Sequence, residues 1–377
     1  MDPLDLSSKL INYRSITPKS SGSIEYLKKL LEKYNFECHF LEFGKYKVKN
    51  LYAFIKGGKG PTFCFAGHTD VVPPGDLNKW KTDPFKAVIK NGKLYGRGSS
   101  DMKSAIAAFI VASIDFLKKN DSKFKGTLAM LFTSDEEGEA EFGTKSVIKW
   151  LKKKKINIDY CIVGEPTNPN QLGEMIKIGR RGSINFNLEI YGVQGHVAYP
   201  EKAVNPIDNT LKICIKLKEP FDKGSENFQP TSLVITSIDA LNNVTNIIPG
   251  KISMKFNIRF NDNFKSSEII NIVHKRIKSV TLNYKLKHRV SGESFINKSE
   301  VLTKSLIKSI KEITNLNPSL STSGGTSDAR FICELCPVLE FGLIGKTMHQ
   351  TNEMMEIKNI KNLTKIYFEL IKNIFND

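Results

Sequence analysis

Short apolar segments that end abruptly in histidine or acidic side chains recur through the first half of the chain. Residues 62–66, 127–133 and 158–163 are such segments, and the residues at 23–34 and 104–117 have helical patterns. Strands that are apolar along their whole length are buried on both faces, as they are when helices cover both sides of a parallel sheet. The sequence therefore predicts an α/β fold with a mixed, mostly parallel sheet flanked by helices.

The pattern changes near Gly179, where alternating apolar and polar residues replace the continuous apolar runs. Alternation is typical of strands with one exposed face. A compact α+β unit is predicted, with strands at 183–191, 232–238, 251–260 and 282–290 and helices at 205–217 and 266–279. After this unit, helical patterns and a continuous apolar segment follow again, with a helix at 301–314, a strand at 338–341 and a helix at 355–375. We therefore expect one domain, residues 1–179 and 292–377, interrupted by a second domain, residues 180–291.

The net charge of +17, from 56 basic and 39 acidic residues, raises the question of a nucleic-acid or membrane partner. The lysines are spread along the whole chain, without a basic tail or an aromatic-interleaved basic patch. No apolar run approaches the roughly 20 residues that a transmembrane helix needs, and residues 1–10 lack the pattern of a signal peptide. We expect a cytoplasmic protein without nucleic-acid or membrane partners. A nucleic-acid-binding protein is the remote alternative.

The polar residues that follow the apolar segments are candidate metal ligands. They are His68, Asp70, Asp101, Glu136, Glu137 and Glu165. A single histidine at a strand end is usually structural, and adjacent glutamates are usually solvated. Together, at the carboxyl edge where α/β sheets place their sites, they indicate a site for zinc or a similar divalent ion. With His349 added, two metals each receive one histidine and one carboxylate, and a third carboxylate bridges them. Asp70, two residues after His68, suits a carboxylate that orients the imidazole.

Four segments resemble the di-zinc amidohydrolases, a family that includes aminoacylases, acetylornithine deacetylase and glutamate-releasing carboxypeptidases. They are 67–73 (GHTDVVP), 96–103 (GRGSSDMK), 134–138 (SDEEG) and 164–167 (GEPT). Five further segments resemble the branch that removes a succinyl group from diaminopimelate, and they are 179–183 (GRRGS), 246–250 (NIIPG), 257–260 (NIRF), 324–331 (GGTSDARF) and 348–353 (MHQTNE). The resemblance runs essentially from end to end.

The resemblance implies two Zn²⁺ ions per subunit, with Co²⁺ as an alternative metal, in a di-zinc aminopeptidase-like catalytic domain. The implied ligands are Asp101 as the bridge, His68 and Glu165 for one ion, and Glu137 and His349 for the other. Glu136 is then the general base, which activates a water held between the metals, and Asp70 orients His68. The peptide bond between Asp101 and Met102 is expected to be cis.

The resemblance also implies a substrate and a partner. The substrate is N-succinyl-LL-2,6-diaminopimelate, hydrolysed to succinate and LL-2,6-diaminopimelate on the route to lysine. The inserted domain is expected to be a ferredoxin-like lid that forms a homodimer, with His196 reaching across the interface to stabilise the oxyanion in the partner's site. The implied substrate-binding residues are Arg180, Ser183, Asn246, Arg259, Gly325 and Thr326. A related deacylase or a metallo-dipeptidase with a different acyl pocket is the main alternative.

Overall fold

The computed structural model describes residues 1–376, which form two compact units. The first comprises Met1–Ile178, Asn297–Ser321 and the residues from Ser327 onward, and the second comprises Gly179–Ile296 and Thr322–Thr326. The insertion thus extends past residue 291, because the short strands β9 (Gly179–Arg180) and β16 (Phe295–Ile296) pair with each other inside it. The second unit also includes Gly325 and Thr326.

The first unit is built on an eight-stranded sheet with the order β1-β2-β6-β3-β7-β18-β8-β17. The strands are β1 (Glu37–Phe43), β2 (Val48–Lys56), β3 (Thr62–His68), β6 (Thr127–Thr133), β7 (Tyr160–Val163), β8 (Met175–Lys177), β17 (Ser319–Ser321) and β18 (Val338–Glu340). The central pairs are parallel, whereas β1, β2 and β8 introduce antiparallel pairs. The predicted mixed, mostly parallel sheet is confirmed. A separate small sheet contains β4 (Val88–Lys90), β5 (Lys93–Tyr95) and β19 (Met354–Glu356).

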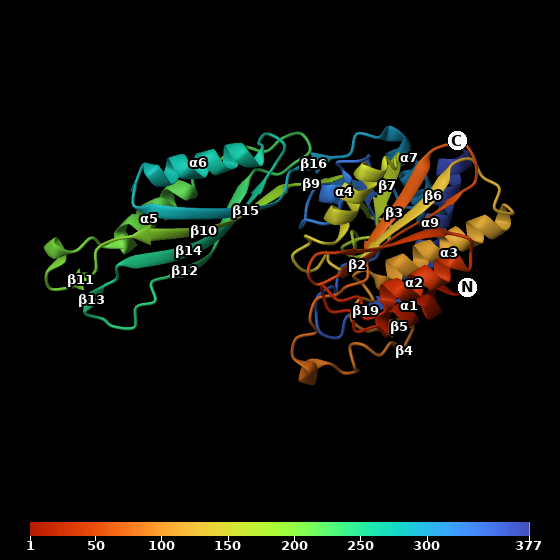
Figure 1. Cartoon of the computed structure of the whole chain (residues 1–377), viewed down its shortest axis with the longest axis horizontal. Helices are drawn as coiled ribbons and strands as arrows, with labels where there is room; N and C mark the ends of the chain where they lie inside the picture. Colours follow the sequence, from red (N-terminus) through yellow and green to blue (C-terminus); the bar gives the residue numbers. More distant parts are fainter. Residues whose placement is uncertain (377) are drawn as a thin grey trace. The chain divides into compact units, whose positions relative to one another are not determined.

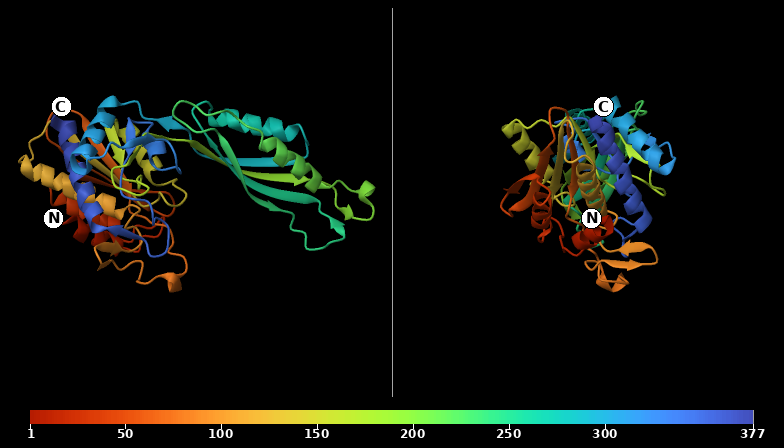
Figure 2. Two further views of the ribbon diagram at one scale, coloured as in Figure 1. Left: turned by 180° about the vertical axis from the view of Figure 1, so that it is seen from behind. Right: turned by 90° about the vertical axis from the view of Figure 1, so that its right-hand side faces the viewer.

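Helices cover both faces of this sheet. They are α1 (Pro3–Ile11), α2 (Ser23–Glu32), α3 (Lys103–Lys119), α4 (Thr144–Lys154), α7 (Glu300–Thr314), α8 (Ala329–Ile332) and α9 (Ile357–Asn376), with a short 3₁₀ turn at Leu77–Lys79. Helix α3 packs between the sheet and its neighbours α1 and α9, while α4 packs on β2 and β6 with α8 (Figure 1). Figure 2 shows α4, in yellow, and α9, in dark blue, on opposite sides of the strands. The central position of α3 explains why its sequence is apolar almost all round.

The core of the first unit is aromatic at its centre. Phe65 of β3 stacks on Phe109 of α3 with ring centroids 4.3 Å apart, and Tyr367 of α9 lies edge-on against both rings. The Tyr367 hydroxyl donates a hydrogen bond of 2.6 Å to the main-chain carbonyl of Phe341. This packing fixes β3, whose last residue is His68, against the helix that begins two residues after Asp101.

The second unit has the element order β-α-β-β-α-β of a ferredoxin-like fold. Its antiparallel sheet has the order β12-β14-β10-β15, formed by β10 (Gly182–Tyr191), β12 (Ser232–Asp239), β14 (Lys251–Phe260) and β15 (Tyr284–Gly292). Helices α5 (Pro206–Leu217) and α6 (Ser266–Lys278) pack on the sheet. Short strands β11 (Gly195–His196) and β13 (Ile247–Ile248) pair at one end, beside a 3₁₀ turn at Pro200–Lys202.

Side chains of alternate residues of β10 point into the core of the second unit, as the sequence alternation predicts. Ile184, Phe186, Leu188 and Ile190 are buried there, and Phe186 stacks on Phe256. One face of the sheet is therefore packed under α5 and α6. Among residues 1–376, none of the helices combines the length and the apolar character required to cross a bilayer.

Candidate metal centre and active site

The five predicted metal ligands come from five separate segments of the first unit. His68 is the last residue of β3, Glu137 lies four residues after β6, and Glu165 lies two residues after β7. Asp101 immediately precedes the Met102 cap of α3, and His349 lies in the loop that leads to β19. Adjacent parallel strands end at the same edge of a sheet, which is why β3, β6 and β7 deliver their polar residues to one place.

Asp101 lies between the two histidines. Its Oδ1 is 3.2 Å from His68 Nε2, and its Oδ2 is 3.2 Å from His349 Nε2. A second carboxylate flanks each imidazole, since Glu165 Oε1 is 3.7 Å from His68 Nε2 and Glu137 Oε1 is 2.9 Å from His349 Nε2. Each histidine therefore has one oxygen of Asp101 and one further carboxylate beside it. The Asp101–Met102 peptide bond is cis, as the resemblance predicts.

Glu136 belongs to the same cluster. Ligand atoms of His68, Glu136 and Glu165 lie within 4.8 Å of one another, as do those of His68, Asp101 and Glu137. The structure thus brings every predicted ligand and the predicted base into one continuous group of donors. The division of these donors between two ions, with Glu136 left over as a base, is a prediction from the resemblance.

Two buried atoms of this cluster, a nitrogen and an oxygen, are placed to bind a divalent cation rather than to form hydrogen bonds within the chain. His68 Nε2 and Asp101 Oδ1 face one another in the interior, yet no residue in the described part of the chain gives either atom a hydrogen bond of good geometry. Unpaired buried polar atoms are rare because each one loses its bonds to water without compensation. Imidazole nitrogen and carboxylate oxygen are also the donors that zinc takes in enzymes. The residues present therefore fit a divalent metal ion.

The carboxylates of the cluster raise one another's affinity for protons. Burial, with the nearby charge of Glu165, raises the pKa of Glu136 well above its ordinary value. Burial and the charge of Asp101 do the same to the pKa of Glu165. Burial alone would raise the pKa of Asp101 as well, but His349 and His68 hold it below its ordinary value. Bonds to Asp101 and Glu137 raise the pKa of His349 to about 10. Without a metal, protons must supply the positive charge that the cluster requires.

Asp70 contacts both His68 and the loop of the adjacent glutamates. The His68 Nδ1 atom lies 2.9 Å from the main-chain oxygen of Asp70 and 3.8 Å from its carboxylate Oδ1. A proton on Nδ1 would bond to that carbonyl and leave the Nε2 lone pair directed at the cluster. The other carboxylate oxygen accepts hydrogen bonds of 3.1 Å from the main-chain N–H groups of Glu136 and Glu137. The second set of contacts is not expected from the sequence, and it fixes the loop that carries both glutamates.

A fully buried ion pair, Arg97 with Glu353, joins the segments that carry Asp101 and His349. Arg97 Nη1 is 2.7 Å from Glu353 Oε2. The other carboxylate oxygen of Glu353 accepts hydrogen bonds from the main-chain N–H groups of Gly98, Ser100 and Asp101, at 3.2, 2.8 and 3.1 Å. Glu353 therefore holds the backbone of the bridging aspartate directly.

Arg97 holds the other segment. Its guanidinium donates to the main-chain oxygens of Gln350, at 3.1 Å, and His349, at 3.5 Å, and lies over the ring of Trp80. The sequence analysis assigned no role to Arg97 or Glu353, although they lie in the motif segments of Asp101 and His349. The available signal was one residue of each charge, Arg97 and Glu353, in two segments that both supply metal ligands.

The predicted substrate-binding residues of the second unit form two separate groups. Near the start of β10, Ser183 pairs in register with Arg259 of β14. Arg180, three residues earlier, donates to the main-chain oxygen of Ser323 at 2.8 Å, against the segment that contains Gly325 and Thr326.

His196 and Asn246 lie at the other end of the same sheet. They are in the region of β11 and β13, which Figure 1 shows at the far end of the second unit's sheet. Val197 N–H donates to the Asn246 carbonyl there, and both side chains are exposed. The eight residue-to-residue steps of extended strand from Ser183 to Tyr191 span about 26 Å at about 3.3 Å per step. One copy of this unit therefore does not bring the two groups to a single small ligand.

Comparison with known proteins identifies related chains along the whole length. Residues 64–373 match the family described as Peptidase family M20/M25/M40. A succinyl-diaminopimelate desuccinylase of Pelagibacter ubique (strain HTCC1062) is 50% identical over 380 residues, covering 99% of this chain and 98% of the relative. A protein of the same name from Wolbachia pipientis wMel is 48% identical over 377 residues, covering 100% of this chain and 94% of the relative.

Solved structures share the fold at low sequence identity. The M20 family metallo-carboxypeptidase Sso-CP2 of Sulfolobus solfataricus matches with a TM-score of 0.82 and 20% identity, covering 99% of both chains. YxeP of Bacillus subtilis, a dinuclear metal-binding peptidase of the M20 family, matches with a TM-score of 0.72 and 14% identity, covering 99% of this chain and 98% of that one. These structures support the two-part α/β architecture.

The Glu353→Gln substitution tests whether the buried ion pair positions the metal ligands. Glutamine has nearly the same shape, but it leaves Arg97 without a counter-charge and turns an amide N–H₂ toward other donors. We expect affinity for divalent metal to fall about 10–100-fold, the range seen when residues that support metal ligands are changed. Metal retained after dialysis against graded chelator, measured by elemental analysis, gives the result.

Glu356→Gln is the matched control, because Glu356 lies on β19 and pairs with Lys358 at the surface. It should leave metal affinity unchanged. If Glu353→Gln lowered the melting temperature but retained metal as the wild type does, the pair would stabilise the fold without positioning the ligands.

Proposed function

The chain belongs to the peptidase family M20/M25/M40, and from this premise we propose that it hydrolyses N-succinyl-LL-2,6-diaminopimelate to succinate and LL-2,6-diaminopimelate. The observation that carries the proposal is the similarity of 46–50% identity, from end to end, to proteins named succinyl-diaminopimelate desuccinylase. The converged cluster of two histidines and four carboxylates supports the metal-dependent amide hydrolysis that this reaction requires. The product feeds the biosynthesis of lysine and of diaminopimelate-containing polymers.

We propose that two Zn²⁺ ions, with Co²⁺ as an alternative, bind this cluster. The ligands would be His68, Asp101 and Glu165 for one ion and Asp101, Glu137 and His349 for the other. When bound, such a pair of cations acts as a Lewis acid that polarises the amide carbonyl and makes water a stronger acid. Asp101 suits the bridging position because each of its oxygens already faces a different histidine.

Glu136 is the proposed proton carrier. Amide hydrolysis joins the oxygen of water to the carbonyl carbon and breaks the bond to nitrogen, so one proton must move from the water to the leaving amine. A carboxylate in this position accepts that proton and returns it to the nitrogen. The raised pKa of Glu136, caused by burial and the charge of Glu165, favours proton uptake. Asp70 would hold Glu136 in place through its main-chain N–H.

We propose that the arginines of the second unit recognise the carboxylates of the substrate. Planar guanidinium groups bind carboxylates through two parallel hydrogen bonds. Arg180 of β9, together with Ser183 of β10 and its register partner Arg259 of β14, would form one part of this site. The Gly325–Thr326 segment would supply backbone and hydroxyl donors.

A homodimer would resolve the separation between the two groups of predicted substrate-binding residues. His196 and Asn246 lie at one end of the sheet and Ser183 and Arg259 at the other, so a second copy is required if all four contact one substrate. Among residues 1–376, the exposed imidazole of His196 has just one hydrogen-bond partner, the nearby Ala198 N–H, from which it accepts. In this arrangement His196 of each subunit would stabilise the oxyanion in the partner's site.

The second unit also has a surface suited to such an interface. Leu211 and Ile215, on the outer face of α5, have 59% and 70% of their surface exposed, and Val234 on β12 has 60% exposed. Strand β12 is an edge strand, which can pair with a second copy of itself. Exposed apolar side chains gathered on a folded unit mark interaction sites, and Leu211 and Ile215 lie one turn apart on α5.

We further propose that the protein acts in the cytoplasm and has no nucleic-acid or membrane partner. The 56 basic residues are distributed along the whole chain, and many form surface ion pairs with glutamate. A nucleic-acid-binding protein would give binding that weakens steeply with salt.

Turnover of three substrates separates the proposed activity from that of the related deacylases. The metal-loaded protein should release succinate from N-succinyl-LL-2,6-diaminopimelate at least about 100-fold more efficiently than it hydrolyses N-acetylornithine or a simple dipeptide. The reason is that a site built for the carboxylate at the end of the succinyl group rejects acyl groups that lack it. Preference for N-acetylornithine or the dipeptide would refute the substrate assignment but not the family.

The Glu136→Gln variant tests the proton carrier. Glutamine cannot accept the proton from water, so turnover should fall by about 10³-fold or more while the protein still binds two metal ions per subunit. The Glu139→Gln variant, three residues along the same loop and exposed, is the control and should keep its turnover. Substantial turnover by Glu136→Gln would show that another group carries the proton.

Mixed dimers test whether His196 acts across the interface. Glu136→Gln and His196→Ala subunits should each be inactive alone. In a mixed dimer, one site would combine an intact Glu136 with an intact His196 of the other subunit, so random mixing should restore about one quarter of wild-type turnover. If His196 served its own subunit, no site would be complete and mixing would restore nothing.

A further inference from the structure

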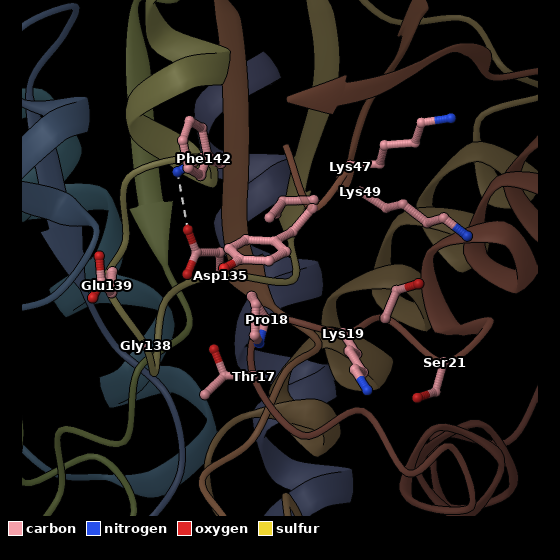
Figure 3. Close-up of a pocket in the computed structure, with 13 residues that line it drawn as sticks. Thr17, Pro18, Lys19, Ser21, Lys47, Lys49, Asp135, Gly138, Glu139 and Phe142 are labelled. Carbon is pink, nitrogen blue, oxygen red and sulfur yellow. Dashed lines mark hydrogen bonds between the residues drawn. The ribbon is translucent and has the colours of Figure 1, made fainter. Parts of the chain in front are cut away.

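A cavity of about 690 Å³ lies in the first unit, beside the loop that carries the two glutamates after β6 (Figure 3). Three lysines and two acidic residues line it, namely Lys19, Lys47, Lys49, Asp135 and Glu139, and Lys49 also pairs with Glu25. The side chains of Lys19 and Lys47 point in different directions (Figure 3). The charges of the described residues around this cavity therefore balance. Positive charge is gathered instead on the sheet of the second unit.

That sheet has one covered face and one open face. Alternate residues of β10 from Ile184 to Ile190 are buried under α5 and α6, so the residues between them point to the other side. Figure 1 shows both helices on the same side of the strands. Register partners in neighbouring strands point to the same face, so the pairing extends this alternation across the sheet. The residues of the open face thus follow from strand position and register.

The open face carries more positive than negative charge. Its basic residues are Lys251, Lys255, Arg259, Lys285, Lys287 and Arg289, and its acidic residues are Glu189 and Asp239. Glu189 already contacts Lys251, at 3.1 Å, and the Tyr191 hydroxyl, at 2.7 Å. Asp239 accepts a hydrogen bond of 2.7 Å from the Leu241 N–H. The two carboxylates therefore leave most of the positive charge of this face uncompensated.

Lys255 and Lys287 lie in one row across the open face. Asn187 of β10 pairs in register with Lys255 of β14 on one side and with Lys287 of β15 on the other. Neighbouring strands are about 4.8 Å apart, so the Cα atoms of the two lysines are about 10 Å apart. Both lysines are exposed, and neither forms an ion pair with any residue between 1 and 376. Two like charges at this spacing add to a single positive potential above Asn187.

Side-chain amides connect this lysine row to the proposed substrate-binding residues. Asn257 donates to the Asn185 side chain at 2.8 Å and to the Ser183 hydroxyl at 3.1 Å, and it accepts from Arg259 Nε at 3.0 Å. Ser183 lies four residue steps along β10 from Asn187, which is about 13 Å. At that distance the lysines act on a ligand near Ser183 through their electric field rather than through contact.

We propose that the open face attracts the anionic substrate toward Ser183 and Arg259, an inference that rests on the proposed function. N-succinyl-LL-2,6-diaminopimelate has three carboxylates and one ammonium group, so it is an anion near neutral pH. A surface of the opposite charge raises the local concentration of such a ligand and its rate of encounter. The lysine row would act before the substrate is bound, so it would assist capture and leave the chemical step unchanged.

Thiol labelling of an Asn187→Cys variant measures the potential of the open face without any enzymatic reaction. Sulfonatoethyl methanethiosulfonate, an anion, and trimethylammonioethyl methanethiosulfonate, a cation, are reacted separately, and labelling of the peptide that contains residue 187 is followed by mass spectrometry. The ratio of anion to cation rates should fall at least about threefold when Lys255→Gln/Lys287→Gln is added, because two nearby positive charges are removed. An unchanged ratio would overturn the proposal.

The matched control is Lys275→Gln/Lys278→Gln. These two lysines are exposed on α6, which packs on the covered face of the same sheet. The control removes the same charge from the same unit, and it should leave the labelling ratio at residue 187 unchanged. An equal fall in the ratio would show an effect of net charge alone and would overturn the role of the open face.

The salt dependence of turnover connects the open face to substrate capture. In about 0.01 M salt, where the Debye length is about 30 Å, Lys255→Gln/Lys287→Gln should lower kcat/KM for the succinylated substrate at least about threefold and leave kcat unchanged. In about 1 M salt, where the Debye length is about 3 Å, the difference from the wild type should disappear. Lys255→Arg/Lys287→Arg and the α6 control should match the wild type at both salt concentrations.

Two results of the turnover assay would overturn the proposal. A lower kcat at every salt concentration would show that the lysines support the structure, and an unchanged kcat/KM would show that the open face does not guide the substrate. A wild type that does not hydrolyse the succinylated substrate would refute the proposed function and, with it, the identity of the anion. The labelling ratio would still test the charge of the open face, so the two failures are distinguishable.

Discussion

Repulsion among buried carboxylates is the constraint around which the first unit is organised. Asp101, Glu136, Glu137 and Glu165 converge near two imidazoles, in an interior where like charges interact far more strongly than in water. Two sets of contacts hold them there. The backbone N–H groups of Glu136 and Glu137 donate to the Asp70 carboxylate, and the Arg97–Glu353 ion pair fixes the segments of Asp101 and His349. Such an arrangement is stable only when positive charge balances the carboxylates. Divalent cations can supply that charge and leave the carboxylates ionised. The structure is therefore preorganised for metal at the expense of its metal-free state.

The residues that the sequence makes predictable are those whose position follows from a strand end. His68, Glu137 and Glu165 lie at the end of an apolar segment or within four residues of it. Parallel neighbouring strands end at one edge, so the convergence of these residues follows from the pattern. Arg97 and Glu353 are different, because their contacts depend on how two loops far apart in the sequence fold against each other. The β1–β2 hairpin was also missed, since its exposed edge strand lacks the continuous apolar run that marks the central strands.

The inserted unit shows how length along a strand can decide which residues share a site. Its alternation predicted a half-exposed sheet, and the four-stranded ferredoxin-like arrangement confirms it. Motif resemblance gathered Ser183, Arg259, Asn246 and His196 into one functional set, but register places them at opposite ends of β10. A motif carries no information about distance within one subunit. Pairing register supplies it, and here it separates the two groups by most of the length of β10.

The connection between Arg97 and Glu353 also has a consequence for biosynthesis. A chain emerges from the ribosome from its N-terminus, so Asp101 and the glutamates near β6 and β7 exist well before His349 and Glu353 are made. Until the C-terminal segment arrives, the backbone of Asp101 lacks the carboxylate that holds it, and the cluster lacks one imidazole. A nascent or proteolytically shortened chain would thus hold a divalent cation with fewer of its donors in place. Completion of the polypeptide would therefore be needed before the backbone of Asp101 and the second imidazole take their final positions in the cluster.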